Sequence, residues 1–175
     1  MNLNINKINT LILILSATLA SGSVTYAKKP VLKAELNSVN VTRLSLHRAT
    51  ELAKAAINAC RKKGIQVGVT VVDRNGIVQV TLRDTLAAPL TLKISALKAY
   101  TAANFAVNTS QLKRQANSPL AQVNGLMMSP GGVAVKVGGK LLAAIGVSGA
   151  PSGITDETCA VAGVKKLIRE LELDI

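Results

Sequence analysis

The sequence predicts an α+β domain in which helices pack on a central antiparallel sheet. Two pairs of segments rich in β-branched residues are each joined by a short glycine-containing turn, which is typical of antiparallel hairpins. Segments with helical periodicity precede, separate and follow these pairs. Hydrophobic residues make up 49% of the 175 residues and charged residues 17%, a balance that allows a sizeable core and excludes bulk disorder.

The N-terminus has the pattern of a secretory signal. Lys7 precedes a ten-residue apolar stretch at 11–20, and the small residues at 25 and 27 fit the site that a signal peptidase reads. A transmembrane helix needs about 20 apolar residues, so this stretch is too short for one. We expect cleavage after Ala27, a periplasmic or secreted protein, and no transmembrane span in the mature chain. The expected organisation is a signal peptide at 1–27, a basic N-terminal arm at 28–43 and a folded domain at 44–175.

The first half of the domain is predicted to contain a helix and a hairpin. Apolar residues recur three or four positions apart from Leu46 to Cys60, with Ser45 as the N-cap and Gly64 as the C-terminal stop. Two β-branched segments then flank Asn75-Gly76, a pair that favours the positive φ of a tight turn. The predicted strands are residues 65–73 and 77–83.

The second half is predicted to contain two helices, two or three strands and a last helix. A stripe of small residues marks the first of these helices, and small side chains let a helix approach a sheet closely. Gly138-Gly139 joins the last two strands, and Thr155 or Asp156 is the expected cap of the final helix. The predicted elements are helices at 90–106 and 110–116, strands at 126–128, 133–137 and 140–148, and a helix that ends at Leu171.

Positive charge is concentrated in one part of the mature chain. The formal net charge of the whole sequence is +12; residues 28–114 carry 15 basic and four acidic side chains, whereas residues 115–175 carry five of each. This asymmetry indicates a basic face and an anionic partner. Aromatic residues make up only 2%, which argues against the base-stacking modules that bind single-stranded nucleic acid, so we expect no nucleic-acid partner.

The sequence contains no recognisable catalytic set. The glycine pairs match no phosphate-binding motif, and Ser148 does not lie in a nucleophile elbow. The only histidine, His47, falls on the polar side of the first helix, where it is either a surface residue or an axial ligand of a haem. Tyr100, Met127 and Met128 are further candidate haem ligands, although methionine also commonly fills gaps in a core.

Arg83 and Lys98 are candidates for binding carboxylates. Arg83 ends a predicted strand next to Asp84, and Lys98 lies among alanines beside Tyr100. Together the two cations match a ligand that carries propionates, or a small organic acid. The structural alternative is a loop tie between Arg83 and Asp84 and a lysine whose stem packs along the surface.

Cys60 and Cys159 leave two alternatives open. An oxidising compartment favours a disulfide between them. Helical-wheel positions disfavour it, because Cys60 lies on the apolar stripe of its helix whereas Cys159 lies about 140° away from the apolar side of the last helix.

The domain also contains a series of short blocks: Thr70-Val71-Val72-Asp73 with Asn75-Gly76, Leu82-Arg83-Asp84, Lys98-Ala99-Tyr100-Thr101-Ala102, Pro130-Gly131-Gly132, Ala144-Ile145-Gly146-Val147-Ser148-Gly149, Asp156-Glu157 and Ala162-Gly163. In this order the blocks resemble the GlcG/HbpS-like family of haem-binding proteins, and its exported subgroup in particular. The resemblance runs from Leu44 to about Leu171.

The resemblance implies a profilin-like layout with a central antiparallel five-stranded sheet, and assembly into homo-oligomers. It also implies haem as the ligand, with a corrinoid as the alternative, and a role in haem, iron or redox handling. The Glu-x-x-Glu pairs linked to iron binding in the family have no match in this sequence.

We therefore expect an exported, non-enzymatic protein that binds haem or a related tetrapyrrole, with Arg83, Lys98 or neighbouring cations on the propionates and His47 as the candidate metal ligand. Two alternatives stay open. One is an enzyme that acts on a small organic acid with Lys98, Tyr100, Arg83 and Asp84. The other is a basic interaction protein of the cell envelope.

Overall fold

The computed structural model describes residues 40–173. The expected signal peptide at 1–27 and residues 28–39 of the expected arm lie outside the described residues. At the described end of that arm, Arg43 Nε lies 3.3 Å from Asp73 Oδ2. No helix within residues 40–173 is both long enough and apolar enough to cross a membrane.

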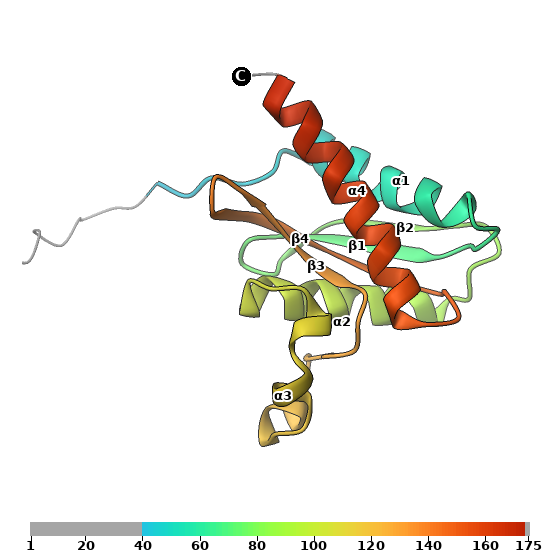
Figure 1. Cartoon of the computed structure of the whole chain (residues 1–175), viewed down its shortest axis with the longest axis vertical. Coiled ribbons are helices and arrows are strands. Elements are labelled where there is room, and N and C mark those ends of the chain that lie inside the picture. The colour runs from blue at the N-terminus through green and yellow to red at the C-terminus, as the bar shows by residue number, and fades with distance from the viewer. Residues whose placement is uncertain (1–39, 174–175) are drawn as a thin grey trace, which may run out of the picture. The chain divides into compact units, whose positions relative to one another are not determined.

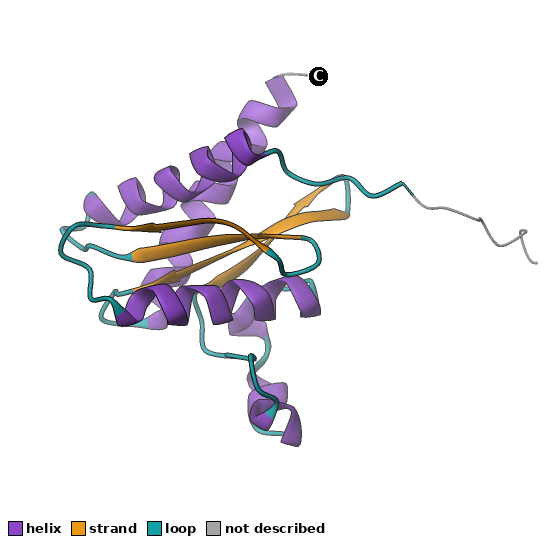
Figure 2. Ribbon diagram, turned by 180° about the vertical axis from the view of Figure 1, so that it is seen from behind, coloured by secondary structure: helices purple, strands orange, loops and turns teal. Residues whose placement is uncertain are grey.

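The described chain forms three layers, as the α+β prediction requires. A four-stranded antiparallel sheet lies between two helices on one face and one helix on the other (Figures 1 and 2). The pair on the first face is α1 (Leu46–Arg61) and α4 (Gly153–Leu173), and the single helix on the second face is α2 (Leu90–Phe105).

Local sequence signals explain where the helices begin. Ser45 caps α1 as predicted, because its side chain accepts a hydrogen bond from the Arg48 N–H at 3.3 Å. Helix α4 starts earlier than predicted: Ser152, rather than Thr155 or Asp156, accepts the Thr155 N–H at 3.1 Å.

The sheet has the strand order β2-β1-β4-β3. Strand β1 is buried along its whole length because it is a central strand that is covered on both faces. Gly68 pairs with Arg83 on one side and with Ser148 on the other, so these residues share one end of the sheet. The strands are β1 (Gly68–Asp73), β2 (Val78–Arg83), β3 (Gly132–Val137) and β4 (Lys140–Ser148).

The expected fifth strand, at residues 126–128, is wrong. This segment belongs to the connection between α2 and β3, where the Leu126 N–H bonds to the Val123 carbonyl in a turn. The Met127 N–H donates to Thr101 Oγ1 at 2.8 Å, so its backbone is bonded to a helix and not to a strand. The helix expected at 110–116 is divided into η1 (Thr109–Gln111) and α3 (Lys113–Ala116), and η2 (Pro119–Gln122) follows them.

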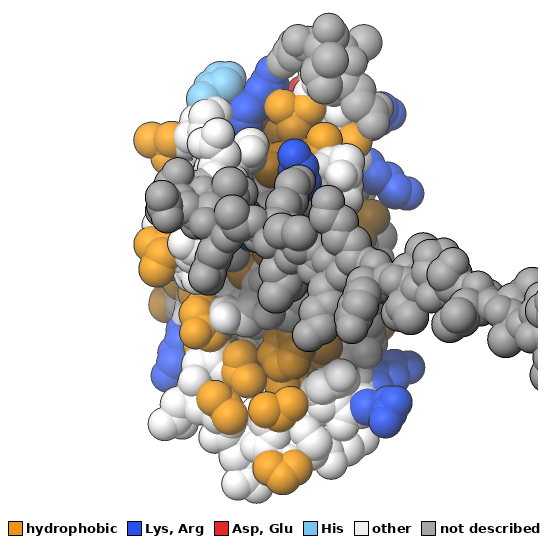
Figure 3. Space-filling model, turned by 90° about the vertical axis from the view of Figure 1, so that its left-hand side faces the viewer, with side chains coloured by type: hydrophobic (Ala, Val, Ile, Leu, Met, Phe, Trp, Pro, Cys, Tyr) orange, Lys and Arg blue, Asp and Glu red, His pale blue; other side chains and the backbone are white. Residues whose placement is uncertain are grey.

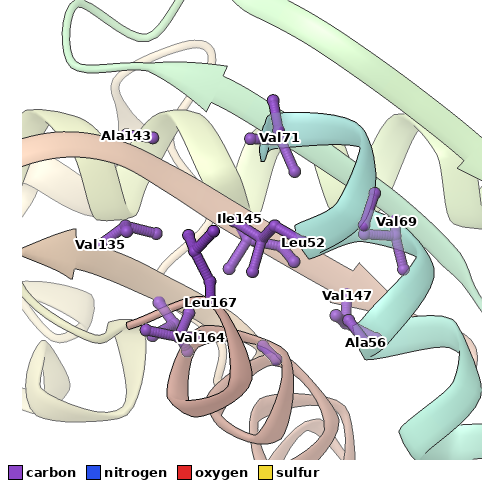
Figure 4. Close-up of a cluster of buried hydrophobic side chains, with 14 of the residues drawn as sticks. Leu52, Ala56, Val69, Val71, Val135, Ala143, Ile145, Val147, Val164 and Leu167 are labelled. Atoms are coloured by element: carbon purple, nitrogen blue, oxygen red, sulfur yellow. The ribbon is translucent and has the colours of Figure 1, made fainter. Parts of the chain in front are cut away.

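The main core lies between the sheet and the α1–α4 pair. Figure 4 shows aliphatic side chains of both helices directed towards the same face of the sheet. The labelled residues are Leu52 and Ala56 of α1, Val164 and Leu167 of α4, and Val69, Val71, Val135, Ala143, Ile145 and Val147 of the strands.

Small residues bring α2 onto the opposite face of the sheet, as its small-residue stripe predicted. Ala99 and Ala102 of α2 pack with Val72 and Ala144 of the sheet. A Cβ atom at Gly146 of β4 would clash with the Ser95 carbonyl oxygen, so the helix backbone lies directly over this glycine.

Cys60 and Cys159 form a disulfide with a Cα–Cα distance of 5.4 Å. The helical-wheel argument against this bridge is therefore wrong. It assumed that α4 buries one side only, whereas α4 packs against both the sheet and α1. The buried arc of α4 is wide enough to include Cys159, which has no exposed surface, as well as Val164.

Candidate functional site

His47 lies in the first turn of α1 and is exposed. Figure 3 shows its imidazole on the surface of the molecule. Tyr100 belongs to α2 and the Met127 N–H is bonded to Thr101 of that helix, which lies on the opposite face of the sheet from α1. The structure therefore separates the candidate axial ligand from the other candidate ligands.

Asp84 pairs with Arg61 and not with Arg83. Arg61 donates two hydrogen bonds of 2.7 Å to the two carboxylate oxygens of Asp84, which is buried. These bonds from Arg61 lower the pKa of the Asp84 carboxyl, while burial acts in the opposite direction. The Arg83 guanidinium instead donates to the Ala87 carbonyl oxygen at 2.5 Å. The expected pair between Arg83 and Asp84 is therefore not formed. Asp84 is bonded to Arg61 of α1, and Arg83 is bonded to the loop backbone.

Lys98 is buried in an ion pair that the sequence did not reveal. Its Nζ donates to Asp156 Oδ2 at 2.9 Å and to the Val147 carbonyl at 3.1 Å, and the two side chains are only 5% and 4% exposed. Burial raises the pKa of the Asp156 carboxyl, and hydrogen bonds from Lys98 and from the Ala150 N–H oppose that shift. Lys98 is therefore committed to an internal partner and is not presented to a ligand.

The surrounding polar groups tie the start of α4 to two loops. Glu157 accepts hydrogen bonds from the Ser110 hydroxyl at 2.5 Å, the Ser110 N–H at 3.2 Å and the Gly131 N–H at 3.1 Å. The space between Gly131 and Lys98 is filled, since a Cβ at Gly131 would lie 2.7 Å from the Lys98 Nζ. This cluster is a structural junction, because its buried polar groups satisfy one another.

Tyr100 is 39% exposed and lies on α2, on the opposite face of the sheet from α1, which carries His47. It lines a shallow cavity of about 330 Å³ together with Gly76, Val78 and Asn124. Met127 and Met128 are partly buried, and the backbone of Met127 is bonded to α2 next to Tyr100. Of the predicted site residues, the structure brings only Tyr100 and the two methionines near one another in this way.

A larger groove lies between α1 and α4, where no site was predicted. It has a volume of about 840 Å³, within the range of roughly 300–1,000 Å³ that is usual for small-molecule sites. One wall comes from the C-terminal half of α1 and the following residues, and the other comes from α4, which crosses α1 on the same face of the sheet (Figure 1). The lining residues are Ala55, Asn58, Ala59, Arg61, Lys62, Lys63, Thr158, Cys159, Ala162, Lys166 and Arg169.

Cations come from both walls of this α1–α4 groove. Five of the lining side chains are Lys or Arg, and none of the described residues that line it is acidic. Arg61 is neutralised by Asp84, and Lys166 Nζ lies 3.7 Å from Glu170. Lys62, Lys63 and Arg169 are exposed and have no carboxylate within 4.0 Å among the side chains that the structure describes, those of residues 40–171. At least three cationic groups are thus available to an anion.

Small residues form the floor between these cations. Ala55, Ala59 and Ala162 leave the space open, and the Cys60–Cys159 disulfide joins the two walls at the same place. The helices cross closely, because a Cβ at Gly163 would lie only 3.0 Å from the Ala56 nitrogen. The groove was missed in the sequence because its parts are about 100 residues apart, although basic residues next to alanines in both helices were a visible signal.

The layered arrangement defines a small α+β domain, and solved structures share this fold. The chain is 43% identical to HbpS in its crystal structure, with a TM-score of 0.72, and the match covers 75% of this chain and 94% of HbpS. A double mutant of Streptomyces reticuli HbpS is 42% identical, with a TM-score of 0.72 and coverage of 81% and 99%. The structure of a PduOC–haem complex is 25% identical, with a TM-score of 0.64 and coverage of 71% and 94%.

Residues 44–165 match the family described as haem-degrading protein, HbpS-like. The chain belongs to this HbpS-like family, as its sequence blocks predicted. Comparison with curated protein sequences gave no match.

Proposed function

We propose that the protein is an exported, non-enzymatic binder of haem or a related anionic tetrapyrrole, and that the α1–α4 groove holds this ligand. The observation that carries the proposal is the combination, in one groove of suitable volume, of an alanine floor and cations that have no carboxylate partner among the described side chains. Two comparisons support the same ligand. The family is described as haem-degrading, and one structural relative, PduOC, was crystallised with haem.

The groove residues fit the chemistry of a haem. Lys62, Lys63 and Arg169 would hold the propionate carboxylates through charged hydrogen bonds. Ala59 and Ala162 would lie against the apolar macrocycle, since their short side chains leave a flat surface. Bound haem would supply an iron centre at the edge of the protein, and the chain's own part is to bind and orient it.

One alternative function loses support from the geometry. The organic-acid site required Arg83, Asp84 and Lys98 together, but each of these side chains has a separate internal partner. A corrinoid remains a test ligand, because it is also a tetrapyrrole. Docking on an anionic envelope surface would use the same cations as haem, and a lack of saturable haemin binding would favour that alternative.

The test is a titration of the purified protein with haemin, in which the change in Soret absorbance is followed until the protein is saturated. We expect one saturable site, and a loss of affinity of about three- to tenfold in Lys62→Gln/Lys63→Gln, because exposed charge pairs contribute modestly. The matched control is Lys136→Gln/Lys140→Gln, which removes two exposed lysines from the β3–β4 hairpin, at the far end of β4 from Ser148. Equal affinity in both double variants would contradict the assignment of the groove.

Export and self-association are parts of the proposal with their own measurements. The signal-peptide pattern supports cleavage after Ala27, which N-terminal sequencing of the secreted protein checks. The expected homo-oligomer stays a prediction, and light scattering of the purified protein at several concentrations measures it.

A further inference from the structure

The side chains that line the α1–α4 groove can bind carboxylates but offer no usual ligand for iron. Haem iron in proteins is held by histidine, cysteine thiolate, methionine or tyrosine. The described lining contains none of these in reactive form, since its one cysteine, Cys159, is bonded to Cys60. The lining of the groove can therefore contact the carboxylates and the ring of a tetrapyrrole, but it does not ligate the metal.

The only histidine, His47, does not line this groove and lies at the other end of α1 from Lys62. His47 lies in the first turn of the helix and Lys62 directly follows its last residue. Fifteen residues of helix span about 22 Å at a rise of 1.5 Å per residue. Met127 and Tyr100 belong to the segment and helix on the opposite face of the sheet.

We infer that the α1–α4 groove recognises the carboxylates and the flat apolar ring of a tetrapyrrole independently of its metal, so that metal-free porphyrin carboxylates bind as haem does. This inference rests on the proposed function and narrows it to a ligand class. It also implies that haem bound here keeps its iron free of any side chain of the groove.

The experiment compares three ligands on the wild-type protein: haemin, protoporphyrin IX without metal, and protoporphyrin dimethyl ester. Absorbance follows haemin, and porphyrin fluorescence follows the other two. We expect the dissociation constants of haemin and protoporphyrin to agree within about threefold, and that of the ester to be at least about tenfold higher.

Variants assign this binding to the groove. Lys62→Gln/Lys63→Gln should lower the affinity for haemin and the affinity for protoporphyrin by the same factor. His47→Ala should change neither affinity. Ala162→Gln should weaken both as well, because it places a long polar side chain over the floor from an exposed helical position that tolerates it. The melting temperature of each variant shows that it remains folded.

The outcomes distinguish the two levels of the proposal. If haemin binds but protoporphyrin binds more than about 30-fold more weakly, recognition depends on the metal and the inference is overturned while the proposed function stands. If the lysine variant lowers the affinity for haemin but not that for protoporphyrin, a lysine amine ligates the iron, and the inference is also overturned. Equal binding of the ester would overturn the role of the carboxylates. If no ligand saturates the protein, the proposed function fails together with the inference.

Discussion

At the scale of single residues, long-range polar pairs hold the loops of this domain in place. Lys98 and Asp156 are 58 residues apart in the sequence, and Arg61 and Asp84 are 23 apart. Both carboxylates are buried, so each depends on its cation to compensate for the loss of water.

Replacing Lys98 by Met should destabilise the protein by about 3–5 kcal/mol, because it leaves a buried carboxylate without its cation. Chemical unfolding measures the loss. In the double variant Lys98→Met/Asp156→Asn the cost should be clearly less than the sum of the two single costs, since the uncompensated charge is gone. Additive costs would show that the two side chains do not interact.

The Asp84 pair should give a stability that depends on acid pH. The pKa of this carboxyl is lower in the folded protein than in the unfolded chain, where it is about 3.9. Its contribution is therefore complete above the unfolded pKa and is lost as the pH falls through the lower folded pKa. The difference in melting temperature between wild type and Asp84→Asn should be constant near neutral pH and shrink below about pH 4.

Glu51→Gln is the control for this titration. Glu51 forms an exposed pair with Lys54 on the same helix, so its removal should have little effect at any pH. A difference for Asp84→Asn that does not change with acid pH would contradict the pairing with Arg61.

At the scale of elements, α1 and α4 act as one unit. They cross closely at Gly163, share the main core with the sheet and are joined by the disulfide. The same crossing creates the groove, so packing of this pair both stabilises the fold and shapes the candidate site.

Removing the disulfide with Cys60→Ala/Cys159→Ala should lower the free energy of unfolding by about 3–5 kcal/mol, because the bridge closes a loop of nearly 100 residues. Unfolding in denaturant, with and without reductant, measures this. Reductant should lower the stability of the wild type and leave that of the double variant unchanged. A wild type that is insensitive to reductant throughout its unfolding transition would contradict the bridge.

Elements were predictable where the signal is local. Ser45, the turn at Asn75-Gly76 and the small residues of α2 each specify their own neighbourhood, and the structure confirms the elements they predicted. The fifth strand failed because a local β-like segment found its hydrogen-bond partner in Thr101. The groove and the burial of Cys159 depend on which helices become neighbours in space, and helical periodicity does not contain that information.

At the scale of the whole molecule, part of the excess positive charge is clustered around one groove. The sequence carries 21 Lys and Arg against nine Asp and Glu, and cations from residues far apart in the chain meet around the α1–α4 groove. The field of such a cluster attracts anions and orients them before contact.

Ligand binding should therefore weaken as salt is added. Exposed charges are screened beyond about 10 Å at 0.1 M ionic strength and beyond about 3 Å at 1 M. We expect the affinity for haemin to fall several-fold between these salt concentrations, and the rise in melting temperature with haemin to shrink accordingly. Urea at a concentration that leaves the protein folded serves as a control for apolar contacts. An affinity that is independent of salt would contradict carboxylate recognition by lysine and arginine.

The disulfide also has a topological consequence. It links the first and last helices of the described chain, so the segment between Cys60 and Cys159 is a closed covalent ring that contains every strand of the sheet. The connection around exposed Val123 extends away from the sheet (Figure 1), where a protease can reach it. One cut there opens the ring without releasing a fragment, and the β1–β2 hairpin of one piece remains paired with the β3–β4 hairpin of the other through β1 and β4. Under oxidising conditions the nicked molecule is a two-chain protein.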